Sequence, residues 1–124
     1  MRMVKYIKGR FKSFKYAFKG IQTLFKEERN AQIQAAASIA ALIMGYWLRI
    51  SAMEWIIICT VIGLVFAMEA INTAIENLAD HACNKEIHPT IKKIKDLSAA
   101  AVLLTAIIAL IAGLIIFLPK LLTL

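Results

Sequence analysis

The sequence contains little of what soluble or secreted folds normally use. It has only two cysteines, Cys59 and Cys83, and two prolines among 124 residues. Two cysteines, one of them inside an apolar run, are too few for a disulfide framework and indicate no redox compartment. Charged residues make up 19% of the chain, yet they are absent from long stretches of it. With 60% hydrophobic residues, this distribution excludes an ordinary soluble domain and predicts a membrane protein.

Two familiar motifs are also missing. The first 29 residues are cationic throughout and lack a continuous apolar core before a small-residue cleavage site, so we expect no cleavable signal peptide. A G-x-x-x-x-G-K-[ST] phosphate loop is absent, so any nucleotide would have to be held without one. The five glycines are scattered along the chain, at Gly9, Gly20, Gly45, Gly63 and Gly113.

Residues 1–29 predict a basic amphipathic helix. Apolar side chains recur at steps of three and four residues, which is the spacing of one helix face, and lysines occupy the other faces. Such a helix can lie in the membrane interface with its lysines on anionic headgroups. A coiled-coil seam and a nucleic-acid surface are the alternatives, but phenylalanine suits a seam poorly and a hydrophobic span follows at once. The apolar positions are Val4, Ile7, Phe11, Phe14, Phe18, Ile21 and Phe25, and the lysines are Lys5, Lys8, Lys12, Lys15 and Lys19.

Three apolar stretches follow, each long enough to cross most of a hydrocarbon layer about 30 Å thick. We expect spans at residues 31–50, 54–79 and 97–118, with a polar loop at residues 80–96. The chain is therefore predicted to be a single all-α membrane domain over residues 1–124, with one interfacial helix and three transmembrane helices.

Lysine and arginine are unevenly distributed around these spans. Nine of them precede the first span and four lie in the loop, whereas only Arg49 and Lys120 lie at the opposite ends. By the positive-inside rule, the N-terminal helix and the loop face the cytoplasm.

The second span carries a stripe of polar residues, which we call the polar stripe: Glu69, Asn72, Glu76 and Asp80. Their spacing of three and four residues places all four within an arc of about 80° on one helix face. Ionisable groups inside a span cost roughly 2.5–3.5 kcal/mol each on insertion scales, so they usually face a bundle interior or a water-filled site. In the expected orientation, the stripe descends from the cytoplasmic surface and reaches about 16 Å deeper at Glu69.

Carboxylates from two helices should meet at the cytoplasmic level. Glu28 precedes the first span at the expected depth of Glu76 and Asp80, and Mg²⁺ favours one or two carboxylates plus substrate phosphates. Lys95 and Asp96 open the third span at that level and add a cation for phosphate. Phosphoryl transfer needs positioning, charge neutralisation and a carboxylate that accepts the hydroxyl proton. The deepest carboxylate of the stripe is the candidate for that base.

The pattern Glu69-x2-Asn72-x3-Glu76-x3-Asp80, followed by Lys95-Asp96-x2-Ala-Ala-Ala-Val, resembles the small bacterial diacylglycerol kinase family, in particular its Gram-positive undecaprenol kinases. The similarity covers nearly the whole chain. It implies a homotrimer in the bacterial cell membrane, with active sites composed between neighbouring subunits. It also implies Mg-ATP phosphorylation of a lipid alcohol, either undecaprenol or, as the alternative, diacylglycerol.

The resemblance assigns roles by match of position. Glu69 would be the catalytic base and Asn72 a positioning group, while Glu28 and Glu76 would bind Mg²⁺. The lipid substrate would contact Glu69 and Ala99, although the alanine run that begins at Ala99 otherwise indicates close helix packing. The ATP-binding residues would be Arg10, Tyr16, Glu28, Glu76, Asp80, Glu86, His88, Lys95 and Asp96.

Two interpretations without an enzyme remain open. A small ion or proton pathway predicts flux without nucleotide, and a structural protein built on the amphipathic helix predicts that the stripe carboxylates can be replaced by alanine. The stripe could also serve only to hold an oligomer together by hydrogen bonds. Three spans have little internal volume to shield the stripe from lipid, which favours an oligomer independently. No nucleic-acid partner is expected, and His81, Cys83 and His88 lack a regular zinc spacing.

Overall fold

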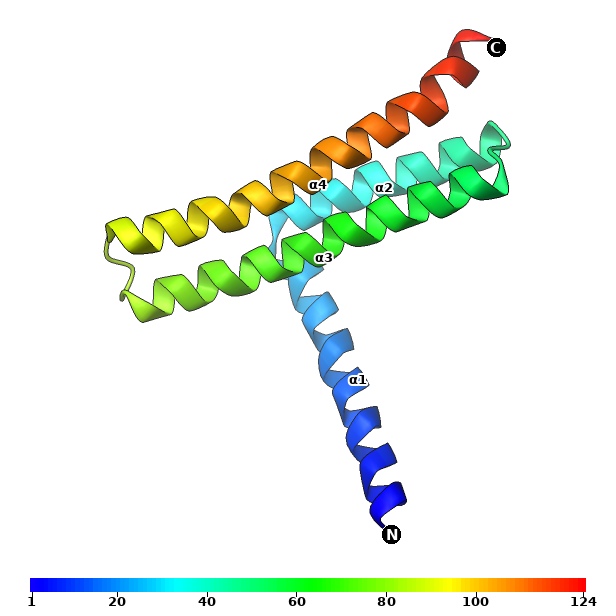
Figure 1. The fold of residues 1–124 in the computed structure, drawn as a ribbon. Helices are drawn as coiled ribbons and strands as arrows, with labels where there is room; N and C mark the ends of the chain where they lie inside the picture. Colours follow the sequence, from blue (N-terminus) through cyan, green and yellow to red (C-terminus); the bar gives the residue numbers. More distant parts are fainter.

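Four α-helices joined by short turns make up the fold, in a computed structural model that describes residues 1–124 (Figure 1). They are α1 (Arg2–Glu27), α2 (Arg29–Trp47), α3 (Ala52–Ala82) and α4 (Pro89–Leu122). The predicted all-α class is confirmed. Helices α2, α3 and α4 run alongside one another, whereas α1 projects away from them (Figure 1).

The two N-terminal helices meet at Glu28. Its extended backbone, with φ of −101° and ψ of 114°, ends α1 and begins α2, so the chain changes direction there. Gln32 Nε2 donates to the Phe25 carbonyl at 3.0 Å across this junction. The Phe25 ring also packs edge-on against Phe66 of α3, with 5.1 Å between the centroids. The end of α1 is thus anchored to the bundle, while nearly all of its earlier residues are exposed.

Two helices, α3 and α4, are long and apolar enough to cross a membrane. Many of their large apolar side chains are exposed, as expected for helices that face lipid or other apolar partners. The predicted first span, residues 31–50, corresponds to α2, which already ends at Trp47 and carries two glutamines in its first half. That α2 also crosses the membrane therefore stays a prediction.

The connection between α3 and α4 is shorter than the loop predicted at residues 80–96. The helices continue through residues 80–82 and 89–96, so only residues 83–88 are non-helical. Pro89 occupies the first helical position, where its fixed φ and missing N–H suit a helix start. His88 caps the helix because its Nδ1 accepts the Thr90 N–H at 3.2 Å.

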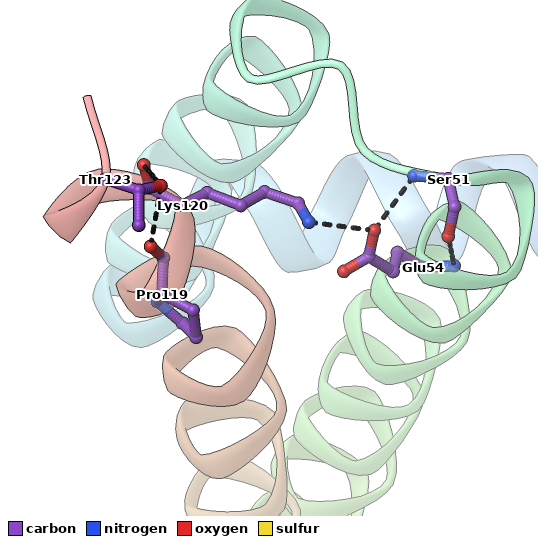
Figure 2. Close-up of polar contacts among 5 residues, drawn as sticks. All are labelled: Ser51, Glu54, Pro119, Lys120 and Thr123. Carbon is purple, nitrogen blue, oxygen red and sulfur yellow. Dashed lines mark hydrogen bonds and ion pairs between the residues drawn. The ribbon is translucent and has the colours of Figure 1, made fainter.

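Glu54 ties α3 to α4 at the end opposite this loop (Figure 2). Ser51 and Glu54 form a capping box, in which Glu54 Oε1 accepts the Ser51 N–H at 2.9 Å and Ser51 Oγ accepts the Glu54 N–H at 3.2 Å. The same Glu54 oxygen lies 3.3 Å from Lys120 Nζ of α4. At the loop end, Lys95 Nζ lies 2.8 Å from Asp80 Oδ1. Ion pairs therefore bracket the antiparallel α3–α4 pair at both ends.

Helix α4 also continues past Pro119, beyond the predicted span at 97–118. A proline near a C-terminus removes one hydrogen bond without stopping the last turn. Thr123 Oγ1 lies 3.1 and 3.2 Å from the carbonyl oxygens of Pro119 and Lys120 and shares its one hydrogen between these two acceptors (Figure 2).

The small apolar core lies near the α2–α3 turn. Gly45 is buried against the Trp55 ring, so that a Cβ built there would lie 2.9 Å from Trp55 Cη2. Because Gly45 has no side chain, the backbone of α2 packs directly against the Trp55 ring of α3. The core consists of Ile50, Ile58, Ile116 and Phe117.

Candidate active site

The polar stripe is buried at its deep end and open at the other. Glu69 is 1% exposed and is the largest fully buried side chain in the molecule, and Asn72 is 6% exposed. Glu76 and Asp80 are half-buried, further along α3 toward the loop. The four residues therefore form a graded series from the interior to the surface, as their spacing predicted.

Two hydrogen bonds order the buried part of the stripe. Gln34 Nε2 of α2 donates to Glu69 Oε2 at 3.2 Å. Asn72 Nδ2 donates to Glu76 Oε1 at 3.2 Å, one helical turn away on the same face. The sequence indicated Asn72 as part of the site, and the structure shows which carboxylate it holds.

A lysine lies at the open end of the stripe. Lys95 precedes the apolar stretch of α4, and its hydrogen bond to Asp80 raises the pKa of its ammonium group. The two side chains are 37% and 42% exposed, so solvent screens the pair and it adds little to stability. Nearby, Asp96 pairs with Lys92 at 2.6 Å on the exposed face of α4. Sequence reasoning placed Lys95 and Asp96 in one site, yet the structure pairs them with different partners.

Four buried polar side-chain atoms have no hydrogen-bond partner. Buried side-chain oxygens are normally paired, so unpaired ones mark places where water or a polar ligand is expected. Gln34 comes from α2, Asn72 and Thr73 from α3, and Ser98 from α4. Asn72 belongs to the stripe, and Gln34 is hydrogen-bonded to Glu69 of the stripe. The atoms are Gln34 Oε1, Asn72 Oδ1, Thr73 Oγ1 and Ser98 Oγ.

Sequence reasoning assigned no role in the site to Gln34, Thr73 or Ser98. A signal was present for two of them, because Gln34 is a polar residue in an apolar stretch and Thr73 adjoins Asn72. Ser98 adjoins Ala99, which is exposed on α4, and the contact of Ala99 with the lipid substrate stays a prediction.

A polar hollow of about 570 Å³ opens at the loop end of the stripe. This is within the usual size range of small-molecule sites. One of the residues that line this hollow, Asp80, was predicted to bind ATP, whereas no site role was predicted for the other four. The lining consists of Asn77, Asp80, His81, Asn84 and Lys85.

The predicted metal ligands come from different elements. Glu28 is half-buried at the α1–α2 junction, and Glu76 is half-buried on α3. No group of three or more histidine, cysteine, aspartate or glutamate side chains gathers anywhere in the chain. Mg²⁺ is usually held by one or two carboxylates together with phosphates and waters, so the hard oxygen donors of Glu28 and Glu76 fit this ion without such a cage. Glu76 also retains a second oxygen that accepts no hydrogen bond from the protein.

Several predicted nucleotide contacts lie apart from the stripe. Arg10 and Tyr16 are exposed on the projecting part of α1, where Arg10 lies 4.9 Å from the centroid of the Tyr6 ring. Glu86 and His88 are in the short loop, and the Nδ1 atom of His88 is occupied as a helix cap. None of these four side chains forms a hydrogen bond or an ion pair with a residue of the stripe.

Comparison with known proteins gives consistent results. The sequence profile of the family described as "Prokaryotic diacylglycerol kinase" matches residues 15–117. The chain is 48% identical to an undecaprenol kinase of Bacillus subtilis over 111 residues, which cover 90% of this chain and 89% of that protein. It is 35% identical to a diacylglycerol kinase of Synechocystis sp. over 90% of this chain and 64% of that protein. A diacylglycerol kinase of Escherichia coli K12 is 29% identical over 77% of this chain and 78% of its own length.

Proposed function

This chain belongs to the prokaryotic diacylglycerol kinase family, and on that basis we propose that it transfers the terminal phosphate of ATP to the hydroxyl of a membrane lipid alcohol. The family resemblance inferred from the sequence is confirmed. The single observation that carries the chemistry is Glu69, a fully buried carboxylate at the deep end of a polar series that opens toward the loop. A hydroxyl near the membrane surface and a water-soluble nucleotide could meet along such a series.

In the proposed reaction, Glu69 accepts the proton of the lipid hydroxyl. The hydroxyl oxygen forms a new bond to the γ-phosphorus of ATP, and the bond from that phosphorus to the β–γ bridging oxygen breaks, so that ADP leaves. Asn72 holds Glu76 at 3.2 Å between this base and the nucleotide end of the stripe. The base and the phosphate-side residues are thereby kept on one helix face.

The nucleotide side is assigned to the open end of the stripe. Lys95, held by Asp80, supplies a positive charge for phosphate oxygens. Glu28 and Glu76 would hold Mg²⁺, which would neutralise charge on the transferred phosphate. We place the adenosine end in the polar hollow. Glu86 and His88 line a second hollow that shares Asn84 with the first, and we assign them to the nucleotide as well. Asp96 on α4 and Arg10 and Tyr16 on α1 are the remaining proposed ATP contacts.

The expected substrate is undecaprenol. The relative with 48% identity over nearly its full length is named an undecaprenol kinase, whereas the diacylglycerol kinases are 35% and 29% identical. Diacylglycerol is the second candidate, because these more distant relatives carry that name. Both alcohols present a hydroxyl at the membrane surface, so the same carboxylate would serve either reaction.

We further propose a homotrimer in which each subunit contributes α2, α3 and α4 as spans. The N-terminal helix and the loop at residues 83–88 would then face the cytoplasm of the bacterial cell. Only 12 of the 124 residues are buried in one subunit, which supports additional burial by neighbours or lipid.

The test uses purified full-length protein in mixed micelles with Mg-ATP. Undecaprenol and diacylglycerol are supplied side by side, and phosphorylated lipid is measured. We expect phosphorylation of undecaprenol at a higher kcat/KM than diacylglycerol, and no product without Mg²⁺. Phosphorylation of neither alcohol would contradict the proposal, and nucleotide-independent ion flux in liposomes would favour the pathway interpretation.

A further inference from the structure

One contact outside the residues assigned above joins α2 to the deep end of the stripe. Gln34 Nε2 donates to Glu69 Oε2 at 3.2 Å, and it is the one side chain that forms a hydrogen bond to Glu69. No lysine, arginine or histidine pairs with this carboxylate. Buried carboxylates normally have several donors or a cation. The orientation of Glu69 therefore depends on a single neutral amide.

The local packing makes this contact possible. Ala31 is fully buried, and it lies one turn before Gln34 on the same side of α2. Its small side chain allows α2 to come close to the bundle at this level. Gln34 then reaches across to α3 at the depth of Glu69.

Chemistry fixes which way the Gln34 amide faces. A carboxylate accepts hydrogen bonds but donates none, so only the NH₂ group of the glutamine can face it. Gln34 Oε1 is then turned away from Glu69, and it is buried without any donor. Such an acceptor is costly unless a water or a ligand supplies a donor. The pair thus offers one free carboxylate oxygen and one unfilled carbonyl oxygen.

We propose that Gln34 is a positioning residue for phosphoryl transfer, and that this pair selects a neutral hydroxyl donor as its ligand. The inference rests on the proposed function. The Gln34 amide holds Glu69 Oε2, which leaves Oε1 to accept the proton of the lipid alcohol. Because two acceptor oxygens and no cation are present, the pair favours an O–H donor and disfavours an anion. The phosphorylated product is therefore repelled from the position that the alcohol occupied.

The test compares three substitutions in the full-length protein with undecaprenol and Mg-ATP. Gln34→Met keeps the length of the side chain and removes its donor, and we expect kcat to fall about 10- to 100-fold, the usual cost of losing an orienting partner. The KM for ATP should remain unchanged. Gln34→His retains an N–H of similar reach and should recover most of the activity. Gln22→Met, on an exposed residue of α1, is the matched control and should behave as wild type.

A double-mutant experiment tests whether Gln34 acts through Glu69. In a Glu69→Gln background, Gln34→Met should cause no further loss of the residual rate, because its role is to orient a base that is already absent. Equal losses in both backgrounds, or a parallel rise in the KM for ATP, would show a structural role and overturn the inference. A wild-type protein that phosphorylates lipid while Gln34→Met stays within about twofold of its kcat would overturn only this inference. An inactive wild-type protein would overturn the proposed function as well.

Discussion

At the scale of single residues, the stripe divides into positions with different surroundings. Glu69 is sealed from solvent and held by one amide, whereas Glu76 is half-buried and accepts from Asn72. A group buried in this way suits proton transfer at the lipid, and a group nearer the surface suits a metal ion with phosphates. Seven residues of helical rise separate the two by about 10 Å.

This division predicts different defects for two isosteric changes. Glu69→Gln should leave ATP binding intact and lower kcat by about 10²- to 10⁴-fold, because a glutamine cannot accept the proton. Glu76→Gln should instead weaken Mg²⁺-dependent use of ATP and raise its KM. Nucleotide-binding measurements beside steady-state kinetics check both expectations. Identical defects in the two variants would argue against separate roles.

The Asp80–Lys95 pair gives a second prediction at this scale. Because both side chains are substantially exposed and solvent screens their attraction, Lys95→Met should leave the unfolding free energy nearly unchanged. It should nevertheless raise the KM for ATP if the ammonium binds phosphate. Thermal unfolding in detergent and nucleotide titration separate the two effects. Lys93→Met serves as the control, because Lys93 is exposed on α4 and pairs with no carboxylate. A large loss of stability without a change in KM would assign Lys95 to the fold alone.

At the scale of helices, the sequence predicted where the helices lie along the chain, but it did not predict the contacts between them. Apolar periodicity for α1, and apolar run length for α2 and α3, predicted these helices to within three residues at each end. Helix α4 begins eight residues before the span predicted from residue 97, because its first turns are polar. The helix ends depended on local capping, so the His88 cap and Pro89 shortened the expected loop. The bond between Gln34 and Glu69 could not be predicted, since a pattern within one helix does not specify its partner on another.

Helix packing also predicts the effect of adding one methyl group. Gly45→Ala would place a Cβ 2.9 Å from Trp55 Cη2 and 3.0 Å from Ile50 Cδ1, so we expect a loss of about 1–3 kcal/mol. Gly63→Ala is the matched control in α3, where nothing lies within 4 Å, and the gain in helix propensity should leave stability equal or higher. Thermal unfolding in one detergent compares the variants. A Gly45→Ala protein as stable as wild type would mean that the turn relaxes freely.

At the scale of the whole molecule, the two native cysteines report the expected arrangement in the membrane. Cys59 is exposed on the apolar part of α3, and Cys83 lies at the start of the short loop. A membrane-impermeant maleimide should therefore label Cys83 in inside-out vesicles but not in intact cells. Cys59 should stay unlabelled in both, because lipid covers it. Cys83→Ser is the control, and labelling of Cys83 from outside intact cells would reverse the proposed orientation.

The ion pairs at the two ends of the α3–α4 pair are separated by a distance that can be compared with the thickness of a bilayer. From Glu54 to Asp80, the helix rises about 39 Å at 1.5 Å per residue. A bilayer measures about 30 Å across its hydrocarbon and 40–45 Å with its headgroups. The Glu54–Lys120 and Asp80–Lys95 pairs would then rest in opposite headgroup layers. Two charged anchors this far apart would resist vertical sliding, and so would keep Glu69 at a constant depth below the surface of a bilayer whose thickness matches their separation.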